Sequence, residues 1–123
     1  MDIKALVDKY GLTKNDFWQL HNNWIVSHNA CEKIAAIENI TMKDIKVLNS
    51  EVDLVRFLIT MDKDGIAITS VGEADIQNCK SKYLGCMAEK RGIDRCILKL
   101  INAYQYGIYS DVEADEFKKG AQQ

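Results

Sequence analysis

The spacing of apolar residues is helical at the start of the chain. Apolar side chains recur at positions 3, 6, 7 and 10 and stop at Gly11, and a second short helical pattern follows over residues 13–20. Residues 24–26 form a compact apolar run typical of a strand. Asn29 and Glu32 then have the spacing of a capping box at a helix start. The pattern predicts two small helices, a short strand and a third helix.

From Ile40 onward, apolar and polar residues alternate. This period of two runs through residues 45–47, 55–59 and 66–68, and it predicts three strands separated by turns at 49–51 and 62–65. Gly65, in the second turn, can take the positive φ that a tight hairpin requires. We expect an antiparallel meander, joined by residues 24–26 as a fourth strand, with one face exposed to water or to a ligand.

A long helical pattern then occupies residues 78–104. Six apolar residues fall on one side of it: Cys86, Ile93, Ile97, Leu100, Ile101 and Tyr104. The sequence therefore predicts an α+β fold, in which a long C-terminal helix packs on an antiparallel three- to four-stranded sheet and short helices precede it. We expect a single domain over residues 1–123, with N-terminal helices at 1–22, a core at 24–107 and an acidic tail at 108–123. Residues 118–123 look disordered.

Composition places this domain among ordinary globular proteins. The chain has 123 residues, 47% of them hydrophobic and 28% charged, so it can build a core without disulfides or a metal. Four cysteines lack zinc-ligand spacing and are expected to be reduced thiols in the core: Cys31, Cys79, Cys86 and Cys96. The charge-interrupted N-terminal run does not resemble a signal peptide, and no apolar stretch is long enough for a membrane span. We expect a cytoplasmic protein without cofactors.

The net charge of -2 conceals a basic segment. Residues 77–110 contain six basic and two acidic side chains, and an acidic stretch follows. Arg91, Arg95 and Lys99, here called the cationic row, are four residues apart and lie on one helix face. Like charges at this spacing repel, so the row suggests an anionic partner such as nucleic acid. Alternatively, Glu89 and Asp94 pair with these cations on a solvated face.

Other candidate groups give weaker signals. Aromatic side chains can stack on unpaired bases, and among several that are expected to be mostly core, Tyr106 and Tyr109 follow the helix. His21 and His28 lie beside asparagines at structural boundaries, which favours turn or cap roles. No catalytic or phosphate-loop motif is present, and clustered acids near the basic helix are few. We therefore expect no enzymatic activity and no metal site.

Two stretches resemble a known family. They are Val71-Gly72-Glu73-Ala74-Asp75 and the run from Met87 to Leu100, MAEKRGIDRCILKL. Together with the predicted order of strand, helix, meander and helix, these residues resemble small phage-encoded proteins and, more distantly, single-strand annealing proteins of the Rad-fifty-two type. The similarity spans roughly residues 24–107.

The resemblance implies a domain that assembles into rings or filaments and holds single-stranded DNA in a basic groove between helix and hairpin. Lys99 falls on a basic, DNA-contacting position of the family, and Lys90 matches a second one. Leu98 stands where a basic residue is expected, and the annealing proteins are often not basic at the positions of Arg91 and Arg95.

We therefore expect single-stranded DNA binding, with strand annealing in phage or mobile-element recombination, by a homo-oligomer in the host cytoplasm. The expected contacts are Lys80, Lys82, Lys90, Arg91, Arg95, Lys99 and Tyr106. The alternative is a phage protein that binds and inhibits a host defence protein and needs no nucleic acid. An exposed apolar patch would then be the important surface.

Overall fold

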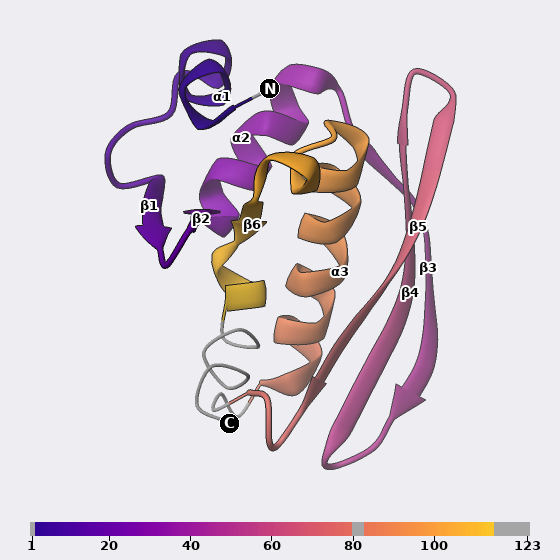
Figure 1. Cartoon of the computed structure of the whole chain (residues 1–123). Coiled ribbons are helices and arrows are strands. Elements are labelled where there is room, and N and C mark those ends of the chain that lie inside the picture. Colours follow the sequence, from indigo (N-terminus) through magenta and orange to yellow (C-terminus); the bar gives the residue numbers. More distant parts are fainter. Residues whose placement is uncertain (1, 80–82, 115–123) are drawn as a thin grey trace.

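The computed structural model of the chain describes residues 2–79 and 83–114. It has an α+β fold, as the sequence predicts (Figure 1). The elements are α1 (Ile3–Tyr10), β1 (Phe17–Leu20), β2 (Asn23–Val26), α2 (His28–Glu38), β3 (Thr41–Ser50), β4 (Leu54–Lys63), β5 (Ile66–Asp75), α3 (Leu84–Leu100), the 3-10 turn η1 (Tyr104–Tyr106) and β6 (Ile108–Ser110).

The larger sheet is the predicted meander, in the order β3-β4-β5. Both strand pairs are antiparallel. The hairpin between β4 and β5 closes on Asp64 and Gly65, whose φ angles are 52° and 82°. The carboxylate of Asp62 accepts a hydrogen bond from the Gly65 N–H at 3.0 Å. The turn chemistry read from the sequence is confirmed.

A second, smaller sheet contains two segments that the sequence analysis assigned differently. It has the order β1-β2-β6, with β1 antiparallel and β6 parallel to β2. Residues 17–20 are a strand and not part of a helix, because Phe17 pairs with Val26 across a tight turn. Residues 24–26 belong to this sheet and are not a fourth strand of the meander, because β6 lies beside them, with Trp24 opposite Ile108.

Helix boundaries follow local capping. Helix α2 begins after Ser27, whose hydroxyl accepts from the Ala30 N–H at 3.0 Å, so the cap is two residues earlier than the predicted Asn29. It ends at Glu38, and the capping residue Asn39 takes a left-handed φ of 57°. Helix α3 is shorter than the predicted 78–104, because Asn102 has a φ of 59° just beyond its last turn.

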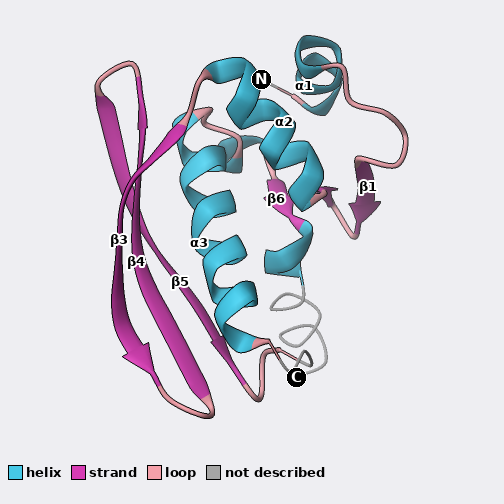
Figure 2. Ribbon diagram, turned by 180° about the vertical axis from the view of Figure 1, so that it is seen from behind, coloured by secondary structure: helices cyan, strands magenta, loops and turns pink. Residues whose placement is uncertain are grey.

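Helix α3 is the centre of the molecule. It lies between the larger sheet on one side and α2 with β6 on the other, as both views show (Figure 2). Its residues Cys96, Ile97 and Leu98 are buried in the main core, where Cys31 also lies. Among the four cysteines, all free, Cys86 alone is exposed. No helix in the described part of the chain is long and apolar enough to cross a membrane.

Helix α3 meets β5 through two glycines. A Cβ atom added to Gly72 would overlap the Ala88 carbonyl oxygen and would lie 2.5 Å from the Gly92 nitrogen. Gly92 faces Gly72 in turn, with its own added Cβ 3.2 Å from the Gly72 Cα. The backbones of helix and strand therefore approach as closely as they can because neither residue has a side chain.

We expect Gly72→Ala to reduce the free energy of unfolding by at least about 2 kcal/mol, because backbone atoms would have to move apart. Gly85→Ala is the matched control on α3, since nothing lies within 4 Å of its added Cβ. That variant should change stability by less than about 1 kcal/mol, in the stabilising direction. Urea denaturation measures both. Equal stability of the two variants would contradict the close approach.

Candidate nucleic-acid interface

Arg91 is fully buried and cannot reach a ligand on the surface. Its Nε donates to the Val112 carbonyl oxygen at 2.8 Å, and its Nη1 donates to the Glu73 carbonyl oxygen at 3.0 Å. The side-chain and main-chain oxygens of Asn78 accept two further hydrogen bonds, each at 2.8 Å. The expected phosphate contact by Arg91 is therefore wrong, because this guanidinium group holds the fold together.

Arg95 has a similar role one turn later. Its Nη1 donates to the Val71 carbonyl oxygen at 2.7 Å, and its Nε forms an ion pair with Glu113 at 3.1 Å. The side chain of Glu113 is 6% exposed and that of Arg95 is 22% exposed. Arg95 is thus paired within the chain by Glu113, an acid other than the Glu89 and Asp94 considered from the sequence. The expectation that Arg95 binds phosphate is therefore corrected, because its guanidinium group makes structural contacts.

Lys99 is the member of the cationic row that reaches solvent. Lys99 is exposed, and its Nζ donates a hydrogen bond to the Ser70 hydroxyl at 2.9 Å. The predicted row does exist, because all three side chains contact β5. It faces the strand, however, and only its C-terminal end is accessible.

The other expected lysines do not extend this surface. Lys90 is exposed, but it lies nine residues before Lys99, about two and a half helical turns, and so on the opposite side of α3. Its charge acts on His28, where it opposes the rise in pKa that the hydrogen bond to Asp94 causes. Lys80 and Lys82 lie outside the described residues. A continuous basic ridge along α3 is therefore not found in the described part of the chain.

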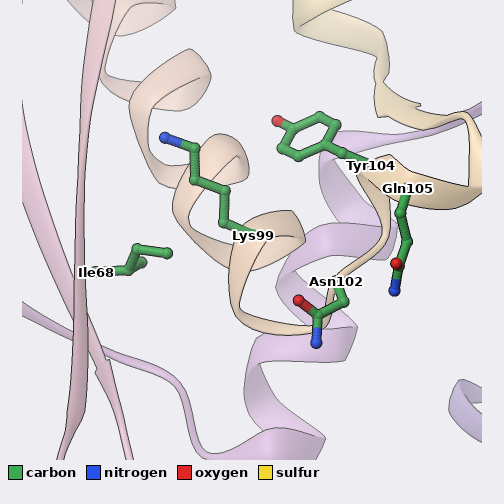
Figure 3. Close-up of a pocket in the computed structure, with 5 residues that line it drawn as sticks. All are labelled: Ile68, Lys99, Asn102, Tyr104 and Gln105. Carbon is green, nitrogen blue, oxygen red and sulfur yellow. The ribbon is translucent and has the colours of Figure 1, made fainter.

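A hollow of about 330 Å³ opens beside Lys99. It is lined by Ile68 of β5, by Lys99, and by Asn102, Tyr104 and Gln105 from the turn after α3 (Figure 3). The hydroxyl of Tyr104 points toward the Lys99 side chain, whereas the carboxamides of Asn102 and Gln105 lie at the other end. The hollow therefore has an aliphatic and aromatic middle, a cation at one end and neutral hydrogen-bonding groups at the other.

The tyrosines that follow α3 are held to different degrees, and of these Tyr104 lines the hollow. The Tyr104 hydroxyl donates to Glu113 at 2.6 Å, and its ring is 5.4 Å from that of Tyr109. Burial and the Glu113 carboxylate both raise the pKa of Tyr104 far above its usual range, so the phenol is neutral. Tyr106, on the same turn η1, is 45% exposed. The Tyr106 ring is thus accessible, and base stacking on it stays a prediction.

The segment after β6 belongs to the folded domain and not to an acidic tail. Ser110, Val112, Glu113 and Ala114 are buried. The Glu113 carboxylate accepts from the Ser110 N–H at 3.0 Å, and that of Asp111 accepts from the His28 N–H at 3.0 Å. Sequence reasoning missed this role, although Ser110 and Glu113 have the S-x-x-E spacing of a capping box. Residues 115–123, including the region expected to be disordered, lie outside the described residues.

The chain matches no protein-family model, no curated protein and no solved structure at a significant level. The site is therefore judged on its own chemistry. Among residues 2–79 and 83–114, no cluster of three or more histidine, cysteine, aspartate or glutamate side chains could hold a metal ion.

A histidine and a buried aspartate form a pair between α2 and α3. His28 contacts Asp94 through Nδ1 at 2.7 Å and Glu32 through Nε2 at 2.9 Å. The hydrogen bond to Asp94 is the main cause of a raised pKa at His28, and burial raises the pKa of Asp94 to about 6. The His28 side chain thus joins α2 to α3, which is a structural role but not the turn or cap role that the sequence favoured.

This pair makes stability depend on pH. Because the pKa of His28 is higher in the folded state than its usual 6.5, its contribution is fully present below that value and is lost as the pH rises through the folded pKa. We therefore expect the free energy of unfolding to fall as the pH rises from about 6.5 through the folded pKa of His28. His28→Gln should flatten this slope, whereas His21→Asn, in an exposed turn, should keep it. Urea titrations at several pH values test this, and an unchanged slope in His28→Gln would contradict it.

Proposed function

We propose that this domain binds single-stranded nucleic acid at the hollow beside the C-terminal end of α3. The observation that carries the proposal is the position of Lys99 beside an aromatic hollow. Its hydrogen-bond partner is a neutral hydroxyl, and no carboxylate of the described residues forms an ion pair with it. A cation held in this way can exchange the hydroxyl for a phosphate oxygen.

An unpaired strand suits this surface better than a duplex. A nucleic-acid ligand must offer a base to the hollow and a phosphate to Lys99 at the same time, and bases in a duplex are already stacked and paired. Base stacking on aromatic side chains is tolerant of sequence, and here it would use Tyr106 at the surface. The net charge of -2 also favours local contacts over coating of a polyanion. No bond is made or broken.

Recombination is the biological setting that we propose. The resemblance to annealing proteins implies it. Because α3 packs directly against β4 and β5, the strand would bind at the C-terminal end of α3 and not between helix and hairpin. By keeping bases unpaired, bound domains would favour the pairing of complementary strands.

The first test compares two lysines of the same helix. Lys99→Gln should weaken binding of a labelled single strand by about 3- to 10-fold at low salt and should reduce the salt slope by about 0.7. Lys90→Gln removes the same charge from the opposite side of α3 and should bind as the wild type does. Fluorescence anisotropy over a salt series measures both. If neither the wild type nor the variants bind nucleic acid, the alternative role as a ligand of a host protein is favoured.

The second test separates base contacts from phosphate contacts. Tyr106→Ala should weaken binding of a normal single strand by about 1–3 kcal/mol, the usual loss of one stacked base. An abasic strand of the same length should bind wild type and variant equally, because it has no base to stack. Tyr10→Phe, which removes a hydroxyl remote from the hollow, is a control for phenol loss. A Tyr106→Ala variant that binds the normal strand as tightly as wild type would exclude stacking at this residue.

A further inference from the structure

Strand β3 is the least covered element of the larger sheet. Along Thr41–Ser50, every residue except Asn49 is exposed. Helix α3 packs over β4 and β5, so it leaves uncovered the β3 residues that share its face of the sheet. Ile45 and Val47 lie opposite the core residues Ile59 and Phe57, yet they are 41% and 63% exposed. The apolar face of the sheet therefore continues to its β3 edge without a cover.

The two edges of this sheet differ in their backbone groups. On β5, the carbonyl oxygens of Val71 and Glu73 accept hydrogen bonds from Arg95 and Arg91, and the Asp75 N–H donates to Asn78. The C-terminal half of that edge is thus occupied by side chains of the same chain. On the outer side of β3, no strand of the described residues is paired. A free edge with unpaired N–H and C=O groups is a template for another strand.

We propose that β3 pairs with β3 of a second copy of this chain, antiparallel and around a two-fold axis at Ile45. Asp44 and Lys46 flank Ile45 on the opposite face of the sheet. In this register, Asp44 faces Lys46 of the partner subunit, and Lys46 faces Asp44 of the partner subunit. A shift of the axis to Asp44 or to Lys46 would place like charges directly opposite each other, which is unfavourable. Among these three registers, the charge pattern therefore favours the one centred on Ile45.

The same register also brings apolar groups together. Ile45 lies directly opposite Ile45 of the partner subunit on the face that α3 leaves open, with Val47 two residues away on the same face. In one copy, Lys46 and Asp44 form only a loose pair, 3.9 Å apart, and their side chains are 67% and 51% exposed. Both groups are thus available for partners across the strand.

The geometry also sets the size of the assembly. Register shifts in the pairing of β3 with β4 at 42–44 and 47–49 bound the regular part of β3, so the new ladder is short. Pairing around a two-fold axis uses the same edge of both copies. The edges left at the outer ends are both β5, where Arg91 and Arg95 occupy the C-terminal half. Assembly through this surface therefore closes at two copies and gives no filament.

A charge exchange tests the interface. Lys46→Asp and Asp44→Lys each replace two attractive contacts by two repulsive ones, and each should weaken dimerisation by about 10-fold or more. The double variant, with both substitutions, should restore the dimer. Mixing the two single variants should produce a heterodimer, because every facing pair then has opposite charges. Lys14→Asp, at an exposed turn, changes the charge as Lys46→Asp does and should leave the dimer unchanged.

Sedimentation velocity over a wide concentration range, at low ionic strength and without nucleic acid, gives the readout. The proposal requires a wild-type dimer, separation of each single variant and recovery in both the double variant and the mixture. It is overturned by a wild type that stays monomeric, as expected if a foreign protein occupies β3, by larger rings or filaments, or by single variants that dimerise as before. Because both sites of substitution are exposed, loss of the fold is checked by an unchanged far-UV circular dichroism spectrum.

Discussion

The buried guanidinium group of Arg91 connects parts of the chain that are distant in sequence. It binds β5 through Glu73, the following loop through Asn78 and the segment after β6 through Val112. A charge without access to water is tolerated only when its donors are well paired, so all of these segments must be in place together. Arg95 adds the pair with Glu113 and a second contact to β5. The packing of α3 on the sheet therefore involves these two side chains in addition to its apolar residues.

The two surfaces proposed for binding lie at opposite edges of the larger sheet. The hollow beside Lys99 is bounded by Ile68 of β5, at one edge of the sheet, and the open strand β3 forms the other edge. If two copies joined through β3, their hollows would lie at the two outer ends of the combined sheet. Each copy would then be able to hold its own strand of nucleic acid without steric conflict with the other.

Elements with a clear hydrophobic period were predictable from the sequence. The direction in which the cationic row faces was not. Alternation over residues 40–69 and the glycine at 65 identify the meander, and the α+β class follows from it. Residues 17–20 are too few for helix and strand periods to be distinguished, and the parallel partner of residues 24–26 is far away at 108–110. Spacing by four places Arg91, Arg95 and Lys99 in one row, but the same spacing is compatible with solvent or with a sheet edge that offers free carbonyl groups.

The parallel pairing of β2 with β6 has a consequence for how the protein is made. Trp24 leaves the ribosome long before Ile108, its partner in the small sheet. The meander and α3 can associate as soon as they emerge, because their contacts are between neighbours in the chain. The N-terminal hairpin can complete its sheet only after β6, the last described strand, has been synthesised. This pairing is therefore a late step in folding. Nascent chains that stall before β6 would expose an unfinished core.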